Sequence, residues 1–416
     1  MSETEVRVLV AAHAWEGKSK GGAERAAAAL VQALNELELV DARLVACIPD
    51  SGVIHQHSPM GLDEHGTTLI RSQTDWDFFS WTSPEMARHW LDLLKAYQPD
   101  VVHLHHYAQT GIELPALVKA WRPETQVVVT LHEFLAMCPQ GGQMIHRSGA
   151  LCSSFGALRC SDCKSWSVEH WAARDAYIRQ GLRQVDHFIA PSEFLRQRYL
   201  AWGLEPHRIR QVPNVTRPVQ DGCHRRASHG SASTRVVFLS QHTPNKGVET
   251  LLKAAILVER RKSAPGLRVE LYGGGAERFG ETFARRVCDL AEKAKGIVSV
   301  HGAFENEGLD AILAGADFVV VPSTWWENSP VVIQEAFARG IPVIASDLGG
   351  MAEQVSDGVN GMLFRAGDAE DLARALEKAV QATDWVVTPP PSALEVAERH
   401  RAIYAYASSA PVRYSP

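Results

Sequence analysis

Short apolar runs rich in β-branched residues recur along the chain and alternate with longer helical stretches. Their nearly continuous apolar character is typical of parallel strands that are covered on both faces. Strands are predicted at 6–10, 44–48, 101–104, 127–131, 187–190, 236–239, 269–272, 318–321 and 342–345. Helices are predicted between them, among others at 23–37, 83–97 and 330–339. This alternation predicts an α/β protein in which ligands bind beyond the carboxyl ends of the strands.

A polar segment interrupts this rhythm in the middle of the chain. It has few apolar residues and collects Gly, Ser, His and Arg, so we interpret it as a link between two domains. Three consecutive prolines at 389–391 cannot be helical and are predicted to end the second domain. The predicted parts are 1–217, the linker 218–234, 235–388, and a tail at 389–416 whose helix, about 393–405, is expected to pack back on the first domain.

Composition and charge exclude several classes of protein. With 45% hydrophobic and 22% charged residues the chain is typical of a globular protein, and its net charge of -6 argues against nucleic-acid binding. The acidic start leads directly into a strand, so no signal peptide is expected, and no apolar run approaches the ~20 residues of a membrane span. Seven cysteines, an odd number, favour a reducing compartment. We therefore expect a cytoplasmic protein.

The loop after the predicted strand 318–321 carries the first candidate chemistry. Ser329 is predicted to cap the following helix, with Pro330 at its first position. The free N–H groups of that first turn form an anion site suited to a pyrophosphate. Glu327, just before the helix, can accept hydrogen bonds from sugar hydroxyls, and Glu335 can reach ribose hydroxyls. Two glutamates at this spacing also arise by chance, so the pair alone does not establish a site.

Three further loops follow predicted strands. Lys246 follows the strand 236–239 and is either a phosphate clamp or a solvated charge. Gly274 lies in a run of three glycines that allows close backbone approach to a ligand, or forms a plain turn. Gly21 and Gly22 lie between the first strand and the first helix, but their spacing is not the dinucleotide fingerprint, so NAD is not predicted.

These motifs, in this order, resemble family 4 of the retaining glycosyltransferases, which have the GT-B fold. The most specific match is Pro-Ser-Thr-Trp-Trp-Glu-Asn-Ser-Pro at 322–330, continued at 334–337 and 340–346. Further matches are at 21–24, 99–105, 190–194, 212–214, 349–353 and 357–361, so the resemblance covers nearly the whole chain. It implies two Rossmann-like doubly wound domains that face each other across a cleft, retention of configuration, and catalysis without a metal ion or other cofactor.

The resemblance also assigns roles to residues of the second domain. Glu327 would contact the donor sugar and Glu335 the ribose. Lys246 would stabilise the diphosphate leaving group together with the backbone at Ser329, Pro330 and Val331. Glu327 is not expected to act as a covalent nucleophile, because the mechanism usually proposed for the family is front-face attack assisted by the departing phosphate.

In the first domain the resemblance assigns His132 to the reacting sugar, and the catalytic set is then His132, Glu327 and Lys246. A structural histidine at a strand end is the alternative for His132, and we interpret His103 and His105 as structural. Gly22, beside Gly21, would help to close the site.

One departure from the family pattern lies five residues before Lys246. The family usually has an arginine there, and this chain has Gln241. An amide can donate a hydrogen bond to a phosphate but cannot neutralise it. Either His242 or an arginine elsewhere compensates, or the donor phosphate is held more loosely.

Four cysteines lie within 26 residues: Cys138, Cys152, Cys160 and Cys163. The last pair has the Cys-x2-Cys spacing of a zinc knuckle, and four thiolates complete a tetrahedral shell. The insert 138–166 is rich in Gly and Ser, so a structural zinc ion would give it order that burial cannot. Unligated thiols on a mobile loop are the alternative. Because the loop follows His132, we expect it to shape the acceptor pocket.

The donor and acceptor are less defined than the fold. We expect a UDP- or GDP-sugar as donor and a glycan or lipid-linked saccharide as acceptor, as in polysaccharide biosynthesis. A nucleotide-sugar 2-epimerase and a non-catalytic nucleotide-sugar-binding scaffold are the alternatives. Arginines 174, 179, 183, 196 and 198 suggest a peripheral contact with the inner membrane face. The simpler explanation is that they are solvated side chains scattered over helices.

Overall fold

The computed structural model describes residues 5–15, 21–48, 60–63, 66–216, 219, 233–304, 308–381 and 384–408. Contacts divide the chain into two compact units, one formed by Met1–Thr216 with Pro391–Pro416 and the other by Arg217–Pro390. Most of the predicted linker 218–234 lies outside the described residues. Among the helices of the described part, none is long and apolar enough to cross a bilayer.

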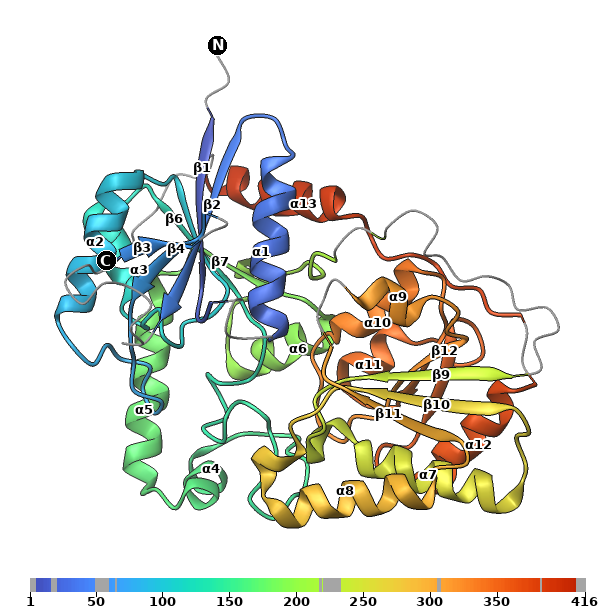
Figure 1. Ribbon diagram of the computed structural model, residues 1–416. Coiled ribbons are helices and arrows are strands. Elements are labelled where there is room, and N and C mark those ends of the chain that lie inside the picture. Colours follow the sequence, from blue (N-terminus) through green and yellow to red (C-terminus); the bar gives the residue numbers. More distant parts are fainter. Residues whose placement is uncertain are drawn as a thin grey trace. The chain divides into compact units, whose positions relative to one another are not determined.

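The first unit is built on an eight-stranded sheet with the order β3-β4-β2-β1-β5-β6-β7-β8, in which only β3 and β4 pair antiparallel. Its strands are β1 (Val6–Ala12), β2 (Val40–Ile48), β3 (Met60–Leu62), β4 (Thr68–Arg71), β5 (Val101–Leu104), β6 (Gln126–Thr130), β7 (His187–Ala190) and β8 (Ile209–Gln211). Its helices are α1 (Gly22–Asn35), α2 (Glu85–Tyr97), α3 (Leu114–Trp121), α4 (Ala157–Lys164), α5 (Val168–Gly181) and α6 (Glu193–Trp202) (Figure 1). The strand order reverses between β1 and β5, where doubly wound sheets bind their ligands.

The second unit is a six-stranded parallel sheet with the order β11-β10-β9-β12-β13-β14. Its strands are β9 (Thr234–Leu239), β10 (Leu267–Tyr272), β11 (Val298–Gly302), β12 (Phe318–Val321), β13 (Val343–Ser346) and β14 (Gly361–Phe364). Helices α7 (Val248–Arg261), α8 (Glu281–Lys293) and α12 (Ala369–Ala379) cover one face, and α9 (Leu309–Leu313), α10 (Val331–Ala338) and α11 (Gly349–Gln354) the other (Figure 1). This is the Rossmann order, and it reverses between β9 and β12.

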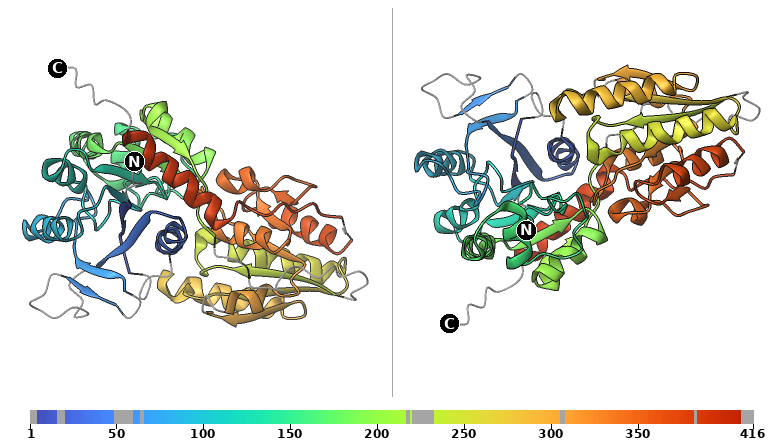
Figure 2. Two further views of the ribbon diagram at one scale, coloured as in Figure 1. Left: turned by 90° about the horizontal axis from the view of Figure 1, so that it is seen from above. Right: turned by 90° about the horizontal axis from the view of Figure 1, so that it is seen from below.

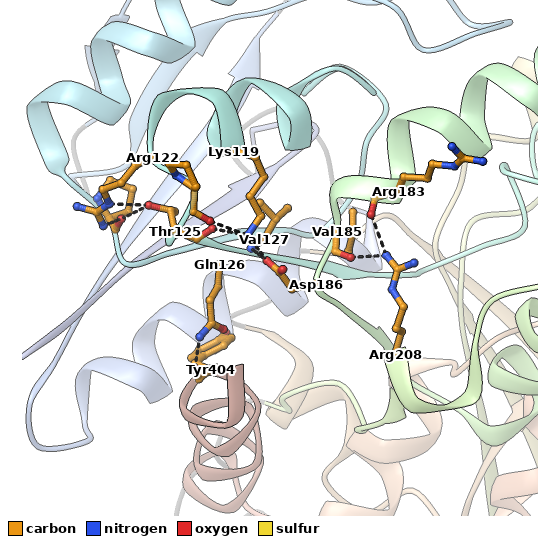
Figure 3. A network of polar contacts seen from close by, with 12 residues as sticks. Lys119, Arg122, Thr125, Gln126, Val127, Arg183, Val185, Asp186, Arg208 and Tyr404 are labelled. Atoms are coloured by element: carbon orange, nitrogen blue, oxygen red, sulfur yellow. Dashed lines mark hydrogen bonds and ion pairs between the residues drawn. The ribbon is translucent and has the colours of Figure 1, made fainter. Parts of the chain in front are cut away.

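The last helix, α13 (Ala393–Ser408), belongs to the first unit and packs across α1 (Figure 2). Val396, Ala397 and Tyr404 join the core that Leu30 of α1 helps to form. The carbonyl of Tyr404 accepts a 2.5 Å hydrogen bond from Gln126 Nε2 at the start of β6 (Figure 3). Helix α13 is therefore part of the core that carries the first sheet.

Each strand predicted from an apolar run is present within a few residues of its predicted bounds. The strands β3, β4, β8, β11 and β14 were not predicted. β3, β4 and β8 are short, and β11 exposes Ser299, Val300 and His301, so its sequence lacks the apolar run of a covered strand. Strands that are this short or this exposed carry little signal in the pattern of hydrophobic residues.

Candidate active site

Two loops meet at the switch point of the second sheet. Lys246 closes the short 3-10 turn Pro244–Lys246 after β9, and Glu327 lies on the loop after β12. Gly247 has φ of 73°, and a Cβ at this position would lie 1.8 Å from the carbonyl oxygen of Pro322. Only glycine allows this approach, so the Lys-Gly sequence brings the lysine to the second loop.

The carboxylate of Glu327 is buried and held by three donors. Its Oε1 accepts hydrogen bonds from Lys246 Nζ at 2.7 Å, Ser323 Oγ at 2.7 Å and Trp325 Nε1 at 2.8 Å. The ammonium of Lys246 also lies 5.4 Å from the centroid of the Trp325 ring. A buried carboxylate is tolerated when it is paired and hydrogen-bonded in this way. The glutamate is therefore fixed in position before any ligand binds.

Helix α10 begins at Val331, with Pro330 at its cap, so the predicted cap was wrong by one residue. Pro330 has ψ of 113°, outside the helical region. Ser329 does not cap the helix, and its Oγ accepts a 3.1 Å hydrogen bond from Gln334 Nε2 instead. The first turn still starts directly after the loop of Glu327, where its N–H groups and the helix dipole favour an anion.

The same loop is packed against the first turn of α11. Gly350 N–H donates to the carbonyl of Glu327 at 2.8 Å, and a Cβ on Gly350 would lie 1.5 Å from the carbonyl oxygen of Asn328. Glu335 lies in the second turn of α10 and is 8% exposed. Arg339 bonds the Glu335 carbonyl at 2.7 Å and forms an ion pair with Asp310, which satisfies the end of α10.

The loops after β9 and β10 contain the remaining predicted donor residues. The close approach falls at Gly273, where a Cβ would lie 1.8 Å from the carbonyl oxygen of Ser240, whereas a Cβ on Gly274 would meet nothing within 4 Å. The Gly274 carbonyl accepts a 2.8 Å hydrogen bond from His242 N–H. Gln241 is exposed. Burial lowers the pKa of His242, so this imidazole supplies no positive charge at neutral pH in place of the family's arginine.

In the first unit, three neighbouring parallel strands lead into histidines. His13 follows β1, His105 follows β5, and His132 lies two residues beyond β6. The ring atoms His132 Nε2 and His105 Nδ1 are 3.2 Å apart. His103, within β5, has both ring nitrogens bonded to hydroxyls, Thr130 Oγ1 at 2.7 Å and Tyr404 at 2.8 Å. These contacts agree with the structural interpretation of His103 but place His105 against His132.

These histidines are electrically neutral at physiological pH. Burial, reinforced by His106 and His13, lowers the pKa of His132 to about 3. Burial and His106 lower the pKa of His13 to about 4 against the opposing effect of Glu24. Burial and the neighbouring imidazoles also lower the pKa of His105. The cluster can therefore donate and accept hydrogen bonds, but it carries no cation.

One tautomer in this cluster follows from its contacts. Ala108 N–H donates to His106 Nδ1 at 2.8 Å, so the ring hydrogen is on Nε2, which lies 3.0 Å from Glu133 Oε1. The same carboxylate accepts a hydrogen bond from Leu135 N–H. A Cβ on Gly142 would lie 2.2 Å from Glu133 Oε2. Glu133 thus joins the strand-end histidines to the loop that leads towards Cys138.

Glu24 is a second carboxylate that the sequence analysis did not single out. It lies in the first turn of α1, is 3% exposed, and its Oε1 is 3.4 Å from His13 Nε2. A Cβ on Gly21 would lie 2.3 Å from Glu24 Oε2. Gly21, which directly precedes the first residue of α1, therefore leaves room for the Glu24 carboxylate. Histidines directly after predicted strands were a signal that could have revealed the cluster.

The four cysteines of the insert, Cys138, Cys152, Cys160 and Cys163, line one small cavity as free thiols. Among the described residues, however, no group of three or more His, Cys, Asp or Glu side chains is arranged to hold a metal ion. The predicted zinc geometry is therefore not present in the chain as it stands.

Most of the arginines considered for membrane contact are engaged within the fold. Arg174 is buried and donates to the carbonyls of Asp77, Leu135 and Ala136 at 2.6, 2.6 and 3.1 Å. The others with described contacts are Arg179 with Asp175, Arg196 with Glu193, and Arg198 with the Ser153 carbonyl. These contacts account for four of the five arginines without a membrane surface.

Two family models match the chain. The model described as "Glycosyl transferase 4-like domain" matches residues 21–215, and "Glycosyl transferases group 1" matches residues 233–382. The first match covers His105 and His132 of the histidine cluster but not His13, and the second covers Lys246, Glu327 and Glu335. Together they account for most of both units.

Similar proteins include the D-inositol 3-phosphate glycosyltransferase of Nocardia farcinica, 32% identical over 215 residues, which are 49% of this chain and 47% of that protein. The alpha-maltose-1-phosphate synthase of Mycolicibacterium smegmatis is 30% identical over 253 residues, or 57% and 62% of the two chains. The matches thus span about half to three fifths of these relatives. The structure of Anabaena HepE in complex with UDP and glucose shares the fold, with a TM-score of 0.64 at 17% identity over 98% of this chain and 100% of that chain.

Proposed function

Because the chain belongs to family 4 of the glycosyltransferases and has their GT-B fold, we propose that it transfers a sugar from a nucleotide-sugar donor to an acceptor hydroxyl with retention of configuration. The observation that carries this proposal is the 2.7 Å pair of Lys246 and Glu327 at the switch point of the second sheet. The pair lies beside the first turn of α10. Its ammonium can bind a phosphate, and its buried carboxylate can accept hydrogen bonds from sugar hydroxyls.

Lys246 and the first turn of α10 stabilise the diphosphate as it leaves. An ammonium has three donors, so Lys246 can keep its bond to Glu327 while it donates to phosphate oxygens. Fixed charge and dipoles aimed at a leaving group are the largest expected contribution to such a transfer. Glu335, in the second turn, is proposed to bind the ribose.

In the transfer the bond between the anomeric carbon and the phosphate oxygen breaks, and the acceptor oxygen bonds to that carbon on the same face. The acceptor proton passes to the departing phosphate oxygen. His132 binds and orients the donor sugar as a neutral hydrogen-bonding group, since burial lowers its pKa to about 3. An uncharged ring at this point does not oppose the positive charge that develops at the anomeric carbon.

The donor is proposed to be a UDP- or GDP-sugar, and the acceptor a glycan or lipid-linked saccharide. The UDP and glucose in the structure of HepE make UDP-glucose the first donor to test. The proposed reaction uses no cofactor, and a structural zinc ion at the cysteine cluster would be separate from it.

The test is a thermal-shift screen against UDP-, GDP-, ADP- and TDP-sugars with the wild type, Lys246→Ala, and Lys253→Ala as the matched control. Lys253 is an exposed lysine on α7. A ligand at 100 times its dissociation constant adds about 2.7 kcal/mol to stability. We expect one nucleotide to stabilise the wild type and Lys253→Ala but not Lys246→Ala. No shift with any nucleotide would contradict a donor site at Lys246, and with it both the transferase and the nucleotide-sugar-binding scaffold.

The epimerase alternative is separated by following the sugar itself. Purified protein is incubated with the stabilising nucleotide sugar, with and without oligosaccharide acceptors, and the sugar products are followed by NMR. Release of the free nucleoside diphosphate together with a new glycosidic linkage supports transfer. Conversion to the C-2 epimer without an acceptor contradicts it.

A further inference from the structure

The segment between His132 and α5 gathers four of the seven cysteines of the chain around one cavity. Cys138 lies in the turn after β6, Cys152 at the end of a small hairpin, and Cys160 and Cys163 on α4. The site is thus assembled from three separate pieces of chain. The proposed transfer reaction uses none of them.

The hairpin positions the second of these cysteines. Ile145 and Leu151 form an antiparallel bridge, and Cys152 N–H donates to the Met144 carbonyl at 2.7 Å. Met144 N–H in turn donates to Cys138 Sγ at 3.3 Å. The hairpin therefore places Cys152 beside Met144, whose own N–H group contacts Cys138.

Helix α4 supplies the other two thiols. Cys160 and Cys163 are three residues apart in Ala157–Lys164, so they lie on one face of the helix. Cys160 Sγ accepts a 3.5 Å hydrogen bond from Gly156 N–H at the start of the helix. Backbone N–H groups thus point at a sulfur in both halves of the cluster. Burial raises the pKa of Cys138 to about 11 and also raises the pKa of Cys160, and these N–H groups oppose that effect.

We infer that Cys138, Cys152, Cys160 and Cys163 form a thiolate site for one thiophilic divalent cation, zinc before others, which closes when the ion binds. Four thiolates are a preferred ligand set for zinc. Since the described side chains are not yet arranged around an ion, the sulfurs must turn towards one another on binding. Each thiol that becomes a ligand releases its proton to solvent, so binding consumes the ion and releases protons.

The loop that carries Cys138 is connected to the strand-end cluster of the first unit. Gly142 N–H donates to the Cys138 carbonyl at 3.2 Å, and Phe134 N–H donates to the Gly142 carbonyl at 3.3 Å. Glu133, which contacts Gly142 and His106, lies next to His132. Closure around an ion would therefore order the segment that begins at His132.

The test measures metal rather than activity, so its outcome does not depend on the proposed function. Protein prepared without chelators or metal-affinity tags is analysed for bound metal by mass spectrometry. The metal-free form is then titrated with Co²⁺ and followed by the sulfur-to-cobalt charge-transfer band. We expect one ion per chain, displacement of Co²⁺ by Zn²⁺, and loss of the band in the double variant Cys160→Ser/Cys163→Ser.

The matched control is Cys288→Ser, because Cys288 is an exposed thiol on α8 of the second unit. It should bind Co²⁺ as the wild type does. If the double variant does not fold, Cys152→Ser tests the same site, since Cys152 is only half-buried, and it should alter the band and weaken binding at least tenfold. The inference is overturned if folded, reduced wild type gives no charge-transfer band, or if the band survives in these variants.

Hydrogen exchange tests the connection to the loop. Addition of Zn²⁺ to the metal-free wild type should slow exchange of the amides at 133–144 but leave those of α7 unchanged. The double variant should show no such change. Equal exchange at 133–144 with and without bound Zn²⁺ would contradict the proposed closure.

Discussion

In the second unit the strand order reverses between β9 and β12, and an ammonium and a carboxylate meet there. In the first unit the order reverses between β1 and β5, and the side chains beyond those strands are mainly imidazoles. In both sheets the candidate residues lie at the carboxyl ends of the strands, where the strand order reverses. The two sites differ in their partners: Lys246 bonds a carboxylate, whereas His105 and His132 lie beside each other and burial lowers the pKa of both.

The difference agrees with the roles proposed for the two sites, Lys246 for the diphosphate and His132 for the sugar. A diphosphate is anionic, so its site benefits from a cation and a helix N-terminus. A sugar offers neutral hydroxyls and develops positive charge at the anomeric carbon, so neutral hydrogen-bonding groups suit it better than cations. Variants that exchange or remove these side chains test whether the difference matters for transfer.

The largest effect is expected for Lys246→Ala. A close charge pair at an effective dielectric near 20 is worth about 4 kcal/mol, so kcat/KM should fall by about three orders of magnitude. The measurement is the initial rate of nucleotide release in the presence of acceptor. Lys253→Ala should retain wild-type rates. A loss of less than tenfold in folded Lys246→Ala would show that the pair does not hold the phosphate.

A smaller loss, about a hundredfold in kcat/KM, is expected for His132→Phe, which keeps the ring volume but removes the hydrogen bonds. His132→Gln should retain more activity because an amide can still donate and accept. Since burial lowers the pKa of His132 to about 3, its titration should not appear between pH 5 and 8. The rate profiles of wild type and His132→Gln should have the same shape over this range. A wild-type inflection near pH 6.5 that vanishes in His132→Gln would make the ring a proton carrier.

The sequence predicted the strand ends and placed Lys246 and Glu327 in one candidate site, because both follow apolar runs that are easily recognised. It did not reveal that the two side chains bond directly, which depends on the approach of Gly247 to Pro322. The cluster of the first unit was harder still. The contacts of His105 with His132 and of His106 with Glu133 require the pairing of β5 with β6.

The stability of the first unit should depend on pH more than that of the second. The pKa of His400 in α13 is lowered by burial to about 4, and burial also lowers the pKa of His13, His103, His105, His132 and His187 in the same unit. The unfolded chain binds these protons from about pH 6.5 downwards. Stability is therefore complete above this pH and is lost as the pH falls from 6.5 towards 4, by at most about 2 kcal/mol for each histidine at pH 5.

The measurement is urea unfolding at pH 7 and pH 5. His400→Gln should lose less stability between the two values than the wild type, since the amide cannot be protonated. His207→Gln, at an exposed position, is the matched control and should behave as the wild type does. Identical pH dependence in all three proteins would show that the buried histidine does not determine it.

The smallest effect is expected where the second unit departs from the family. Gln241→Arg adds a cation on the loop that leads to Lys246, on an exposed side chain that the fold can accommodate. Because His242 is neutral, the added charge should lower the Kd for the donor about three- to tenfold at low salt, and less as salt screens it. Titration calorimetry with the stabilising nucleotide sugar measures this Kd. The control of equal charge is Gln381→Arg, at an exposed position after α12. An equal gain in both variants would indicate a general charge effect, and no gain in either would place the phosphate away from residue 241.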